Sequence, residues 1–97
     1  MRALTFEWDE SKNRANQLKH GVSFDEARSA FLDENARLIS DSEHSDDESR
    51  FVILGLSIRA RVLVVCHCYR EPSETIRIIS ARRAGPSERR EYFRWLK

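Results

Sequence analysis

The spacing of hydrophobic residues in the first third of the chain predicts two short helices. Asp9 is suited to cap a helix over residues 10–20, and Gly21 supplies the left-handed residue that commonly ends one. Ser23 and Glu26 then stand at the spacing of a capping box that begins a second helix. The apolar positions of this second helix share one face, namely Phe24, Ala27, Ala30 and Phe31.

The middle of the chain changes to runs that favour β-strands. Residues 50–57, 61–69 and 74–81 are β-rich and are separated by three or four residues. Such short connections predict an antiparallel meander, and residues 36–40 are a weaker candidate for a further strand. Gly55 inside the first run indicates a bulge or a close approach of another backbone segment.

The end of the chain predicts a last helix. Gly85, Pro86 and Ser87 open it, and Tyr92, Trp95 and Leu96 are its expected core stripe. The expected fold class is α+β, with two N-terminal helices, an antiparallel β-meander sheet of about four strands and a C-terminal helix. No internal repeat or linker is visible, so residues 1–97 are expected to form a single domain.

Composition excludes several classes of protein. The chain of 97 residues is 40% hydrophobic, which suffices for one core, and its three glycines and two prolines argue against disorder or a collagen-like repeat. The longest apolar run, residues 62–66, is far shorter than the roughly 20 residues that span a bilayer. The first residues lack the pattern of a signal peptide. We therefore expect a soluble, cytoplasmic protein without a membrane partner.

Charge is informative through its distribution and not through its sum. Lys and Arg number 17 against 16 Asp and Glu, so the formal net charge is only +1. Residues 33–48 hold seven acidic side chains and one Arg, whereas residues 77–97 hold seven basic and two acidic side chains. Residues 41–49 are almost wholly polar and read as a solvated loop. The chain is thus acidic in a middle loop and basic at its end.

Metal and cofactor motifs are not found in the sequence. Cys66 and Cys68 point to one face of a strand and His67 to the other, so the three cannot converge on one ion. The two cysteines are expected to be small buried thiols. The acidic loop around His44 lacks the spacing of a calcium loop, and phosphate-loop, dinucleotide and Gly-x-Ser-x-Gly patterns are missing. We expect no metal and no cofactor.

A set of cationic residues is the main candidate for chemistry. Lys19 and His20 end the first helix, where a cation also favours the helix dipole. The others are Arg59 and Arg61 around the turn between two strands, Arg77 in mid-strand, and Arg82 and Arg83 at a strand end. Such a cluster can bind phosphate through bidentate guanidinium groups. Ion pairing with the chain's own acids is the alternative for most of them.

RNA cleavage is a reaction that these residue types can perform without a metal. When a 2′-hydroxyl attacks the adjacent phosphorus, the site needs a proton acceptor, a proton donor and positive charge on the developing phosphorane. Histidine can serve as acid or base, and Arg or Lys can stabilise the charge. Composition alone permits this activity and does not show it.

The order of several segments resembles the BrnT family of toxins. The resemblance begins with residues 6–12, Phe-Glu-Trp-Asp-Glu-Ser-Lys, and continues with Asn16-x-x-Lys19-His20-Gly21-Val22-Ser23-Phe24-x-Glu26-Ala27. Farther along it includes His44-Ser45, Glu48-x-Arg50-Phe51, residues 63–70 (Leu-Val-Val-Cys-His-Cys-Tyr-Arg) and residues 76–82 (Ile-Arg-Ile-Ile-Ser-Ala-Arg). It covers the chain from Phe6 to about Tyr92.

The resemblance implies a ribonuclease toxin of a type II toxin–antitoxin pair, which inhibits translation and has a RelE-like fold with helices on one side of a twisted antiparallel sheet. It also implies a BrnA-like antitoxin as protein partner and RNA as substrate, with operator DNA contacted only through the antitoxin. Where family members have Lys-Ala-Thr after Ser-Ala-Arg, this chain has Arg83-Ala84-Gly85, which keeps the charge and lacks the hydroxyl.

Because RelE-like toxins differ in their catalytic residues, only the cationic set is assigned. His20 is expected to be acid or base, and Arg59, Arg77 and Arg82 are expected to contact the phosphate or the transition state. RNA-binding roles are expected for Lys19, Arg61, Arg83 and Tyr92, the last by stacking on a base. A non-catalytic RNA-binding or antitoxin-buffering module on the same fold is the alternative function.

Overall fold

The computed structural model describes residues 4–39, 50–70 and 74–96, and its described strands form one five-stranded sheet. The strand order is β1-β5-β4-β3-β2, with β1 parallel to β5 and all other neighbours antiparallel. In chain order the elements are β1 (Thr5–Glu7), α1 (Glu10–His20), α2 (Phe24–Ser29), η1 (Ala30–Leu32), β2 (Arg37–Ile39), β3 (Arg50–Leu56), β4 (Val62–Arg70), β5 (Thr75–Arg83) and α3 (Pro86–Arg94).

The expectation of about four antiparallel strands was wrong in one element. β1 has three residues and pairs in parallel with the start of β5, in the register Phe6 to Ile76. A strand this short has no alternating pattern of its own, and its partner lies about 70 residues away along the chain. Phe6 of β1 and the nearby Trp8 also pack against the core, a long-range contact that local sequence cannot reveal.

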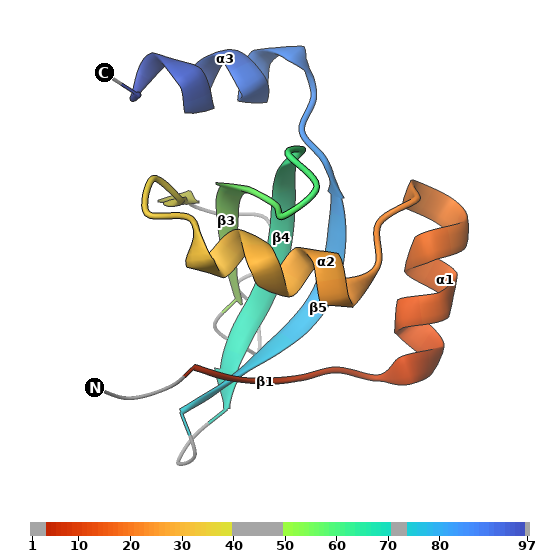
Figure 1. The fold of residues 1–97 in the computed structure, drawn as a ribbon. Coiled ribbons are helices and arrows are strands. Elements are labelled where there is room, and N and C mark those ends of the chain that lie inside the picture. The colour runs from red at the N-terminus through yellow and green to blue at the C-terminus, as the bar shows by residue number, and fades with distance from the viewer. Residues whose placement is uncertain (1–3, 40–49, 71–73, 97) are drawn as a thin grey trace.

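The helices cover both faces of the sheet, which differs from the expected packing on one side (Figure 1). Leu63 and Val65 of β4 pack with α2, whereas Val62 and Val64 pack with Tyr92 of α3. Successive residues of a strand point to opposite faces, so α2 and α3 lie on opposite sides. In Figure 1, α2 crosses β3, β4 and β5, α1 lies beside β5, and α3 lies beyond the end of β5.

The helix boundaries follow the local signals. Asp9 accepts a hydrogen bond from the Lys12 amide at 3.2 Å, and Gly21 ends α1 with a φ of +70°. Ser23 accepts from the Glu26 amide at 3.0 Å and begins α2. The reciprocal half of the capping box does not form, because the Glu26 carboxylate contacts Arg61 and Ser57 instead.

Gly55 is a site of close backbone approach, as expected. A Cβ atom on this residue would lie 2.8 Å from the Ala30 carbonyl oxygen and 3.2 Å from the Ala36 side chain. η1 therefore packs directly on β3, and only glycine fits between them.

The central strand β4 contains the two cysteines. Cys68 is buried and Cys66 is half-buried, and the register of β4 against β5 shifts between Cys66 and His67. The weak strand expected over residues 36–40 is present as β2, whereas the acidic loop at 41–49, with His44, lies outside the described residues. In the part of the chain that is described, no helix has the length and apolar character needed to cross a membrane.

Candidate functional site

A basic pocket lies at the end of the sheet where β4 begins and β5 ends. It has a volume of about 440 Å³ and is lined by Ala60, Arg61, Val62, Arg83, Ala84 and Arg89. The antiparallel register places Leu63 opposite Arg83, and the Ala84 amide donates to the Val62 carbonyl at 2.8 Å. Guanidinium groups from the β3–β4 turn, from β5 and from α3 therefore converge on one hollow.

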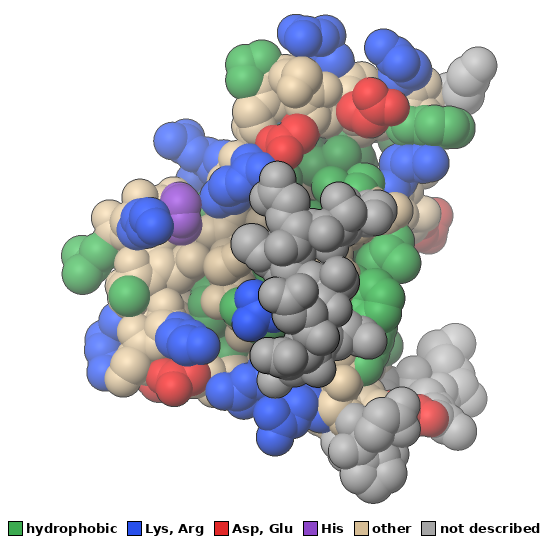
Figure 2. Space-filling view, turned by 180° about the vertical axis from the view of Figure 1, so that it is seen from behind, with side chains coloured by type: hydrophobic (Ala, Val, Ile, Leu, Met, Phe, Trp, Pro, Cys, Tyr) green, Lys and Arg blue, Asp and Glu red, His purple; other side chains and the backbone are tan. Residues whose placement is uncertain are grey.

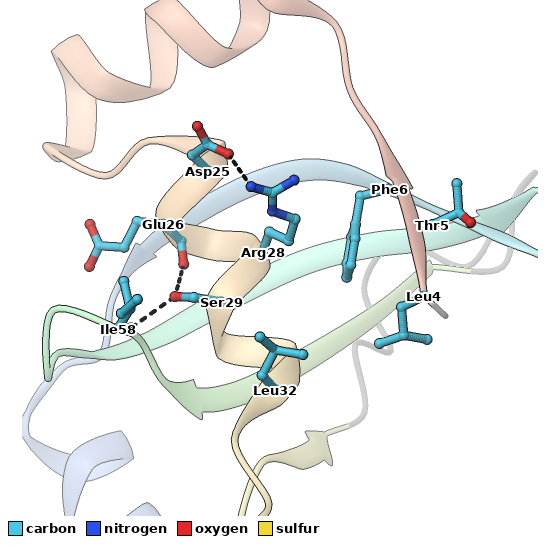
Figure 3. Close-up of a pocket in the computed structure, with 9 residues that line it drawn as sticks. All are labelled: Leu4, Thr5, Phe6, Asp25, Glu26, Arg28, Ser29, Leu32 and Ile58. Carbon is cyan, nitrogen blue, oxygen red and sulfur yellow. Dashed lines mark hydrogen bonds and ion pairs between the residues drawn. The ribbon is translucent and has the colours of Figure 1, made fainter. Parts of the chain in front are cut away.

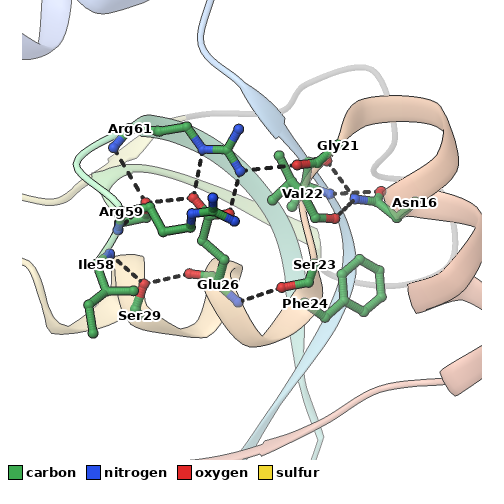
Figure 4. A network of polar contacts seen from close by, with 12 residues as sticks. Asn16, Gly21, Val22, Ser23, Phe24, Glu26, Ser29, Ile58, Arg59 and Arg61 are labelled. Atoms are coloured by element: carbon green, nitrogen blue, oxygen red, sulfur yellow. Dashed lines mark hydrogen bonds and ion pairs between the residues drawn. The ribbon is translucent and has the colours of Figure 1, made fainter.

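Arg61 is held in this pocket by a nearly buried carboxylate. Its Nε donates to Glu26 Oε2 at 2.9 Å, its Nη2 donates to Glu26 Oε1, and Nη2 also donates to the Gly21 carbonyl at 3.0 Å (Figure 4). Burial alone raises the pKa of the Glu26 carboxyl, but hydrogen bonds from Arg61 and Ser57 outweigh it and the pKa lies below its ordinary value. The pair is therefore ionised at neutral pH.

The β3–β4 turn is fixed on α2 by two further contacts. Ser57 Oγ donates to Glu26 Oε2 at 2.7 Å, and the Ile58 amide donates to Ser29 Oγ at 2.8 Å. Figure 4 shows the Ile58–Ser29 contact near Arg59, which is exposed at the turn. α2 thus positions the backbone that carries Arg59 and Arg61.

The end of α1 is joined to the pocket through Arg61. Lys19 and His20 directly precede Gly21, whose carbonyl accepts from Arg61. The last turns of α1 are fixed by Asn16, which donates to the carbonyls of Val22 and Ala81 at 2.8 Å each. In Figure 2, the histidine surface is bordered by lysine and arginine side chains.

The arginines near the pocket differ in how far they are neutralised. Within the described residues, the guanidinium groups of Arg59 and Arg83 make no ion pair, and both side chains are exposed. The Arg82 side chain projects from the face of β5 opposite to that of Arg83. It donates two hydrogen bonds of 2.8 Å to Glu88. Hydrogen bonding to Arg82 holds the pKa of the Glu88 carboxyl below its ordinary value. Arg83 and Arg59 are therefore the better anion-binding groups.

Arg77 is not brought to the pocket. It lies six positions before Arg83 on β5, which is about 20 Å along an extended strand. Its Nη1 donates to Glu7 Oε2 at 3.0 Å, so the mid-strand arginine pairs with an acid of β1. The structure does not support grouping Arg77 with the other cationic candidates.

Tyr92 is not available for stacking on a base. Its side chain is 1% exposed and its hydroxyl donates to Asp33 Oδ2 at 2.5 Å. Burial, together with the neighbouring Asp33, raises the pKa of Tyr92 to about 12. The residue fixes α3 to the sheet, as the core-stripe expectation proposed, and its RNA-binding assignment is corrected on that ground.

Several site residues were missed at the sequence level. Arg89 entered only the charge count, although it lines the pocket. Glu26 was interpreted only as part of a capping box and of the family motif, and Asn16 only as part of that motif. Their partners are distant in sequence, so only the motif that contains Asn16 and Glu26 could have indicated them.

A second hollow has a different chemical character. It has a volume of about 950 Å³ beside α2, and its lining includes Leu4, Phe6, Leu32 and Ile58 (Figure 3). The charged pair at its rim, Asp25 and Arg28, is joined at 2.7 Å. An apolar hollow with a neutralised rim suits a phosphate backbone poorly.

His67 is enclosed by aromatic rings and does not face solvent. It is fully buried, with ring contacts to Phe31, Phe51 and Tyr69, and its Nε2 has no hydrogen-bond partner. Burial lowers the pKa of His67 below its ordinary value, so the imidazole is neutral. Among the described residues, no group of three or more His, Cys, Asp and Glu side chains could hold a metal ion.

Comparisons with known proteins identify the family. Residues 8–88 match the model of the family described as the ribonuclease toxin BrnT of type II toxin–antitoxin systems. The fold is similar to the crystal structure of the Brucella abortus ribonuclease toxin BrnT, with a TM-score of 0.64, 22% sequence identity, and coverage of 86% of this chain and 99% of that chain. No curated protein matches the sequence. The chain belongs to the BrnT family of ribonuclease toxins of type II toxin–antitoxin systems.

Proposed function

We propose that this chain is an RNA endonuclease whose active site is the basic pocket between β4, β5 and α3. The observation that supports it most is the convergence of Arg61, Arg83 and Arg89 on one hollow beside the helix end that carries His20. Two of the three arginines come from the cationic set expected from sequence. A pocket of this charge fits the phosphate backbone of a nucleic acid, and the family description makes RNA the substrate.

The proposed reaction is attack of a 2′-oxygen on the adjacent phosphorus. The O2′–P bond forms and the P–O5′ bond breaks, which leaves a 2′,3′-cyclic phosphate and a free 5′-hydroxyl. The proton of the 2′-hydroxyl goes to a base, and the O5′ leaving group receives a proton from an acid. His20 performs one of these two transfers, and Arg83 and Arg59, which make no ion pair within the described residues, stabilise the negative charge on the phosphorane.

Cleavage is proposed to need no divalent metal. The charged side chains that line the pocket are guanidinium groups, which repel a divalent cation and themselves supply the positive charge that the transition state requires. Arg59, exposed at the β3–β4 turn, and Lys19, exposed at the end of α1, carry further positive charge and contribute to RNA binding.

The proposed partner is a BrnA-like antitoxin, which neutralises the toxin and contacts operator DNA on behalf of the pair. The support is the family's place in type II toxin–antitoxin systems, in which a protein antitoxin accompanies the toxin. Loss of translation in the absence of the antitoxin would follow from RNA cleavage.

The test compares the purified chain with His20→Ala and His20→Gln variants on RNA in excess EDTA. We expect the parent to produce 2′,3′-cyclic phosphate ends, and both folded variants to bind RNA while cleaving it at least about tenfold more slowly. Cleavage that stops in EDTA and returns with magnesium would contradict the metal-independent mechanism. Binding without any cleavage by the parent would support the non-catalytic alternative.

A further inference from the structure

An exposed aromatic ring lies next to the basic pocket and has no part in the proposed reaction. Phe93 of α3 is 44% exposed. Arg89, one helical turn earlier, lines the pocket and also lies over the Phe93 ring, with its guanidinium carbon 5.4 Å from the ring centroid. Residues four apart share a helix face, so the ring continues the surface that begins in the pocket.

Trp95, at the C-terminal end of α3, differs from Phe93 in how closely an arginine contacts its ring. Trp95 is 51% exposed, but the guanidinium carbon of Arg37 lies 3.6 Å from its ring centroid, which is direct contact. The guanidinium carbon of Arg89 lies farther from the Phe93 ring centroid, at 5.4 Å, and so is not in direct stacking contact with that ring. The rings of Phe93 and the buried Tyr92 pack edge-on, with 5.1 Å between their centroids. This contact restricts the position of the Phe93 ring.

We propose that Phe93 is a stacking platform for an unpaired base of the RNA whose phosphates bind Arg61, Arg83 and Arg89. This inference rests on the proposed function and names its substrate class: RNA that is single-stranded at the site. Aromatic side chains stack on bases that are free of a duplex, and nearby cations hold the adjoining phosphates. Arg89 contacts the ring and shares the pocket with Arg61 and Arg83, so an anionic partner fits this surface better than an apolar peptide.

The test measures binding separately from cleavage. An RNA in which every 2′-hydroxyl is methylated cannot attack its own phosphorus, and a single 2-aminopurine in it reports stacking through its fluorescence. We expect the parent to bind this strand at least about tenfold more tightly than the same strand in a duplex. We expect Phe93→Ala and Phe93→Leu to weaken single-strand binding about five- to thirty-fold and to remove the stacking signal.

Matched variants separate stacking from folding and from phosphate binding. Phe93→Trp should keep the affinity, because it keeps an aromatic face, and Trp95→Ala should leave it unchanged. Arg83→Ala should weaken binding to every RNA and reduce its salt dependence. Circular dichroism of each variant checks that α3 remains folded.

The possible failures can be told apart. If Phe93→Leu binds the single strand as the parent does while Arg83→Ala weakens it, the stacking role is overturned and the pocket stands. If the parent binds neither RNA form, both the stacking role and the proposed function are overturned. If Phe93→Ala binds RNA normally but escapes neutralisation by the antitoxin on co-expression, the ring belongs to a protein interface instead.

Discussion

Glu26 and Arg61 join the start of α2 to the start of β4 through an enclosed ion pair. Arg61 donates through Nε and Nη2 to the two carboxylate oxygens, and the side chains are 4% exposed for Glu26 and 27% exposed for Arg61. Ser57 adds a third hydrogen bond to the same carboxylate. One acidic side chain thus fixes the turn that carries Arg59 and places Arg61 at the pocket.

Glu26→Gln should lower the free energy of unfolding by about 2–3 kcal/mol, because it leaves the charge of Arg61 partly buried and unpaired. Asp25→Asn is the matched control. It removes the neighbouring ion pair with Arg28, whose side chains are 69% and 50% exposed, and should cost under about 1 kcal/mol. Urea unfolding of the three proteins at pH 7 measures both effects, and equal costs would contradict the role given to Glu26.

His67 should make the protein less stable in mild acid. Its pKa is lowered by burial in the folded state, so the unfolded chain binds a proton more readily, and stability falls as pH drops below the ordinary value of 6.5. His67→Phe should remove this dependence between about pH 7 and pH 5 and keep the ring packing with Phe31.

Melting temperatures at pH 7.5 and pH 5.5 check this prediction. The parent should lose stability between the two values, whereas His67→Phe should lose much less. A parent protein that is as stable at pH 5.5 as at pH 7.5 would show that burial of His67 has no energetic consequence.

Gly55→Ala should destabilise the protein by about 1–3 kcal/mol. The added methyl group would lie 2.8 Å from the Ala30 carbonyl oxygen, so η1 must move away from β3. Gly85→Ala is the control, because its nearest new contact, with Glu88, is at 3.7 Å. Thermal unfolding compares the two, and a Gly85→Ala cost as large as that of Gly55→Ala would refute the crowding argument.

The sequence predicted the features that depend on contacts between neighbouring residues and missed those that depend on residues distant in the chain. The ends of α1 and α2 were predicted from Asp9, Gly21 and Ser23, because a cap contacts amides only two or three residues away. β1 was missed since its pairing with β5 is long-range. The packing of α3 on the face opposite α2 was also missed, because strand alternation shows that two faces exist and not which helix covers each.

Some residues of the candidate site were also predicted from their local positions, whereas those that depend on distant partners were not. Arg61 and Arg83 were identified from their places at strand ends, and the antiparallel pairing of β4 and β5 brings those ends together. Arg77 looked unusual in mid-strand because Glu7, its partner, reaches it only through the unforeseen β1–β5 pairing. Tyr92 was correctly expected in the core, which is incompatible with stacking on RNA.

The central claim is that the basic pocket cleaves RNA, and the RNA cleavage rates of Arg83→Ala and Arg77→Ala test it most directly. Both variants remove one arginine of β5, but only Arg83 lines the pocket, whereas Arg77 pairs with Glu7. With purified proteins of verified fold, we predict that Arg83→Ala slows cleavage by at least about tenfold. Arg77→Ala should lower the melting temperature and stay within about twofold of the parent rate. The reverse order of cleavage rates in two folded variants would contradict the account and place the active site at the other end of the sheet.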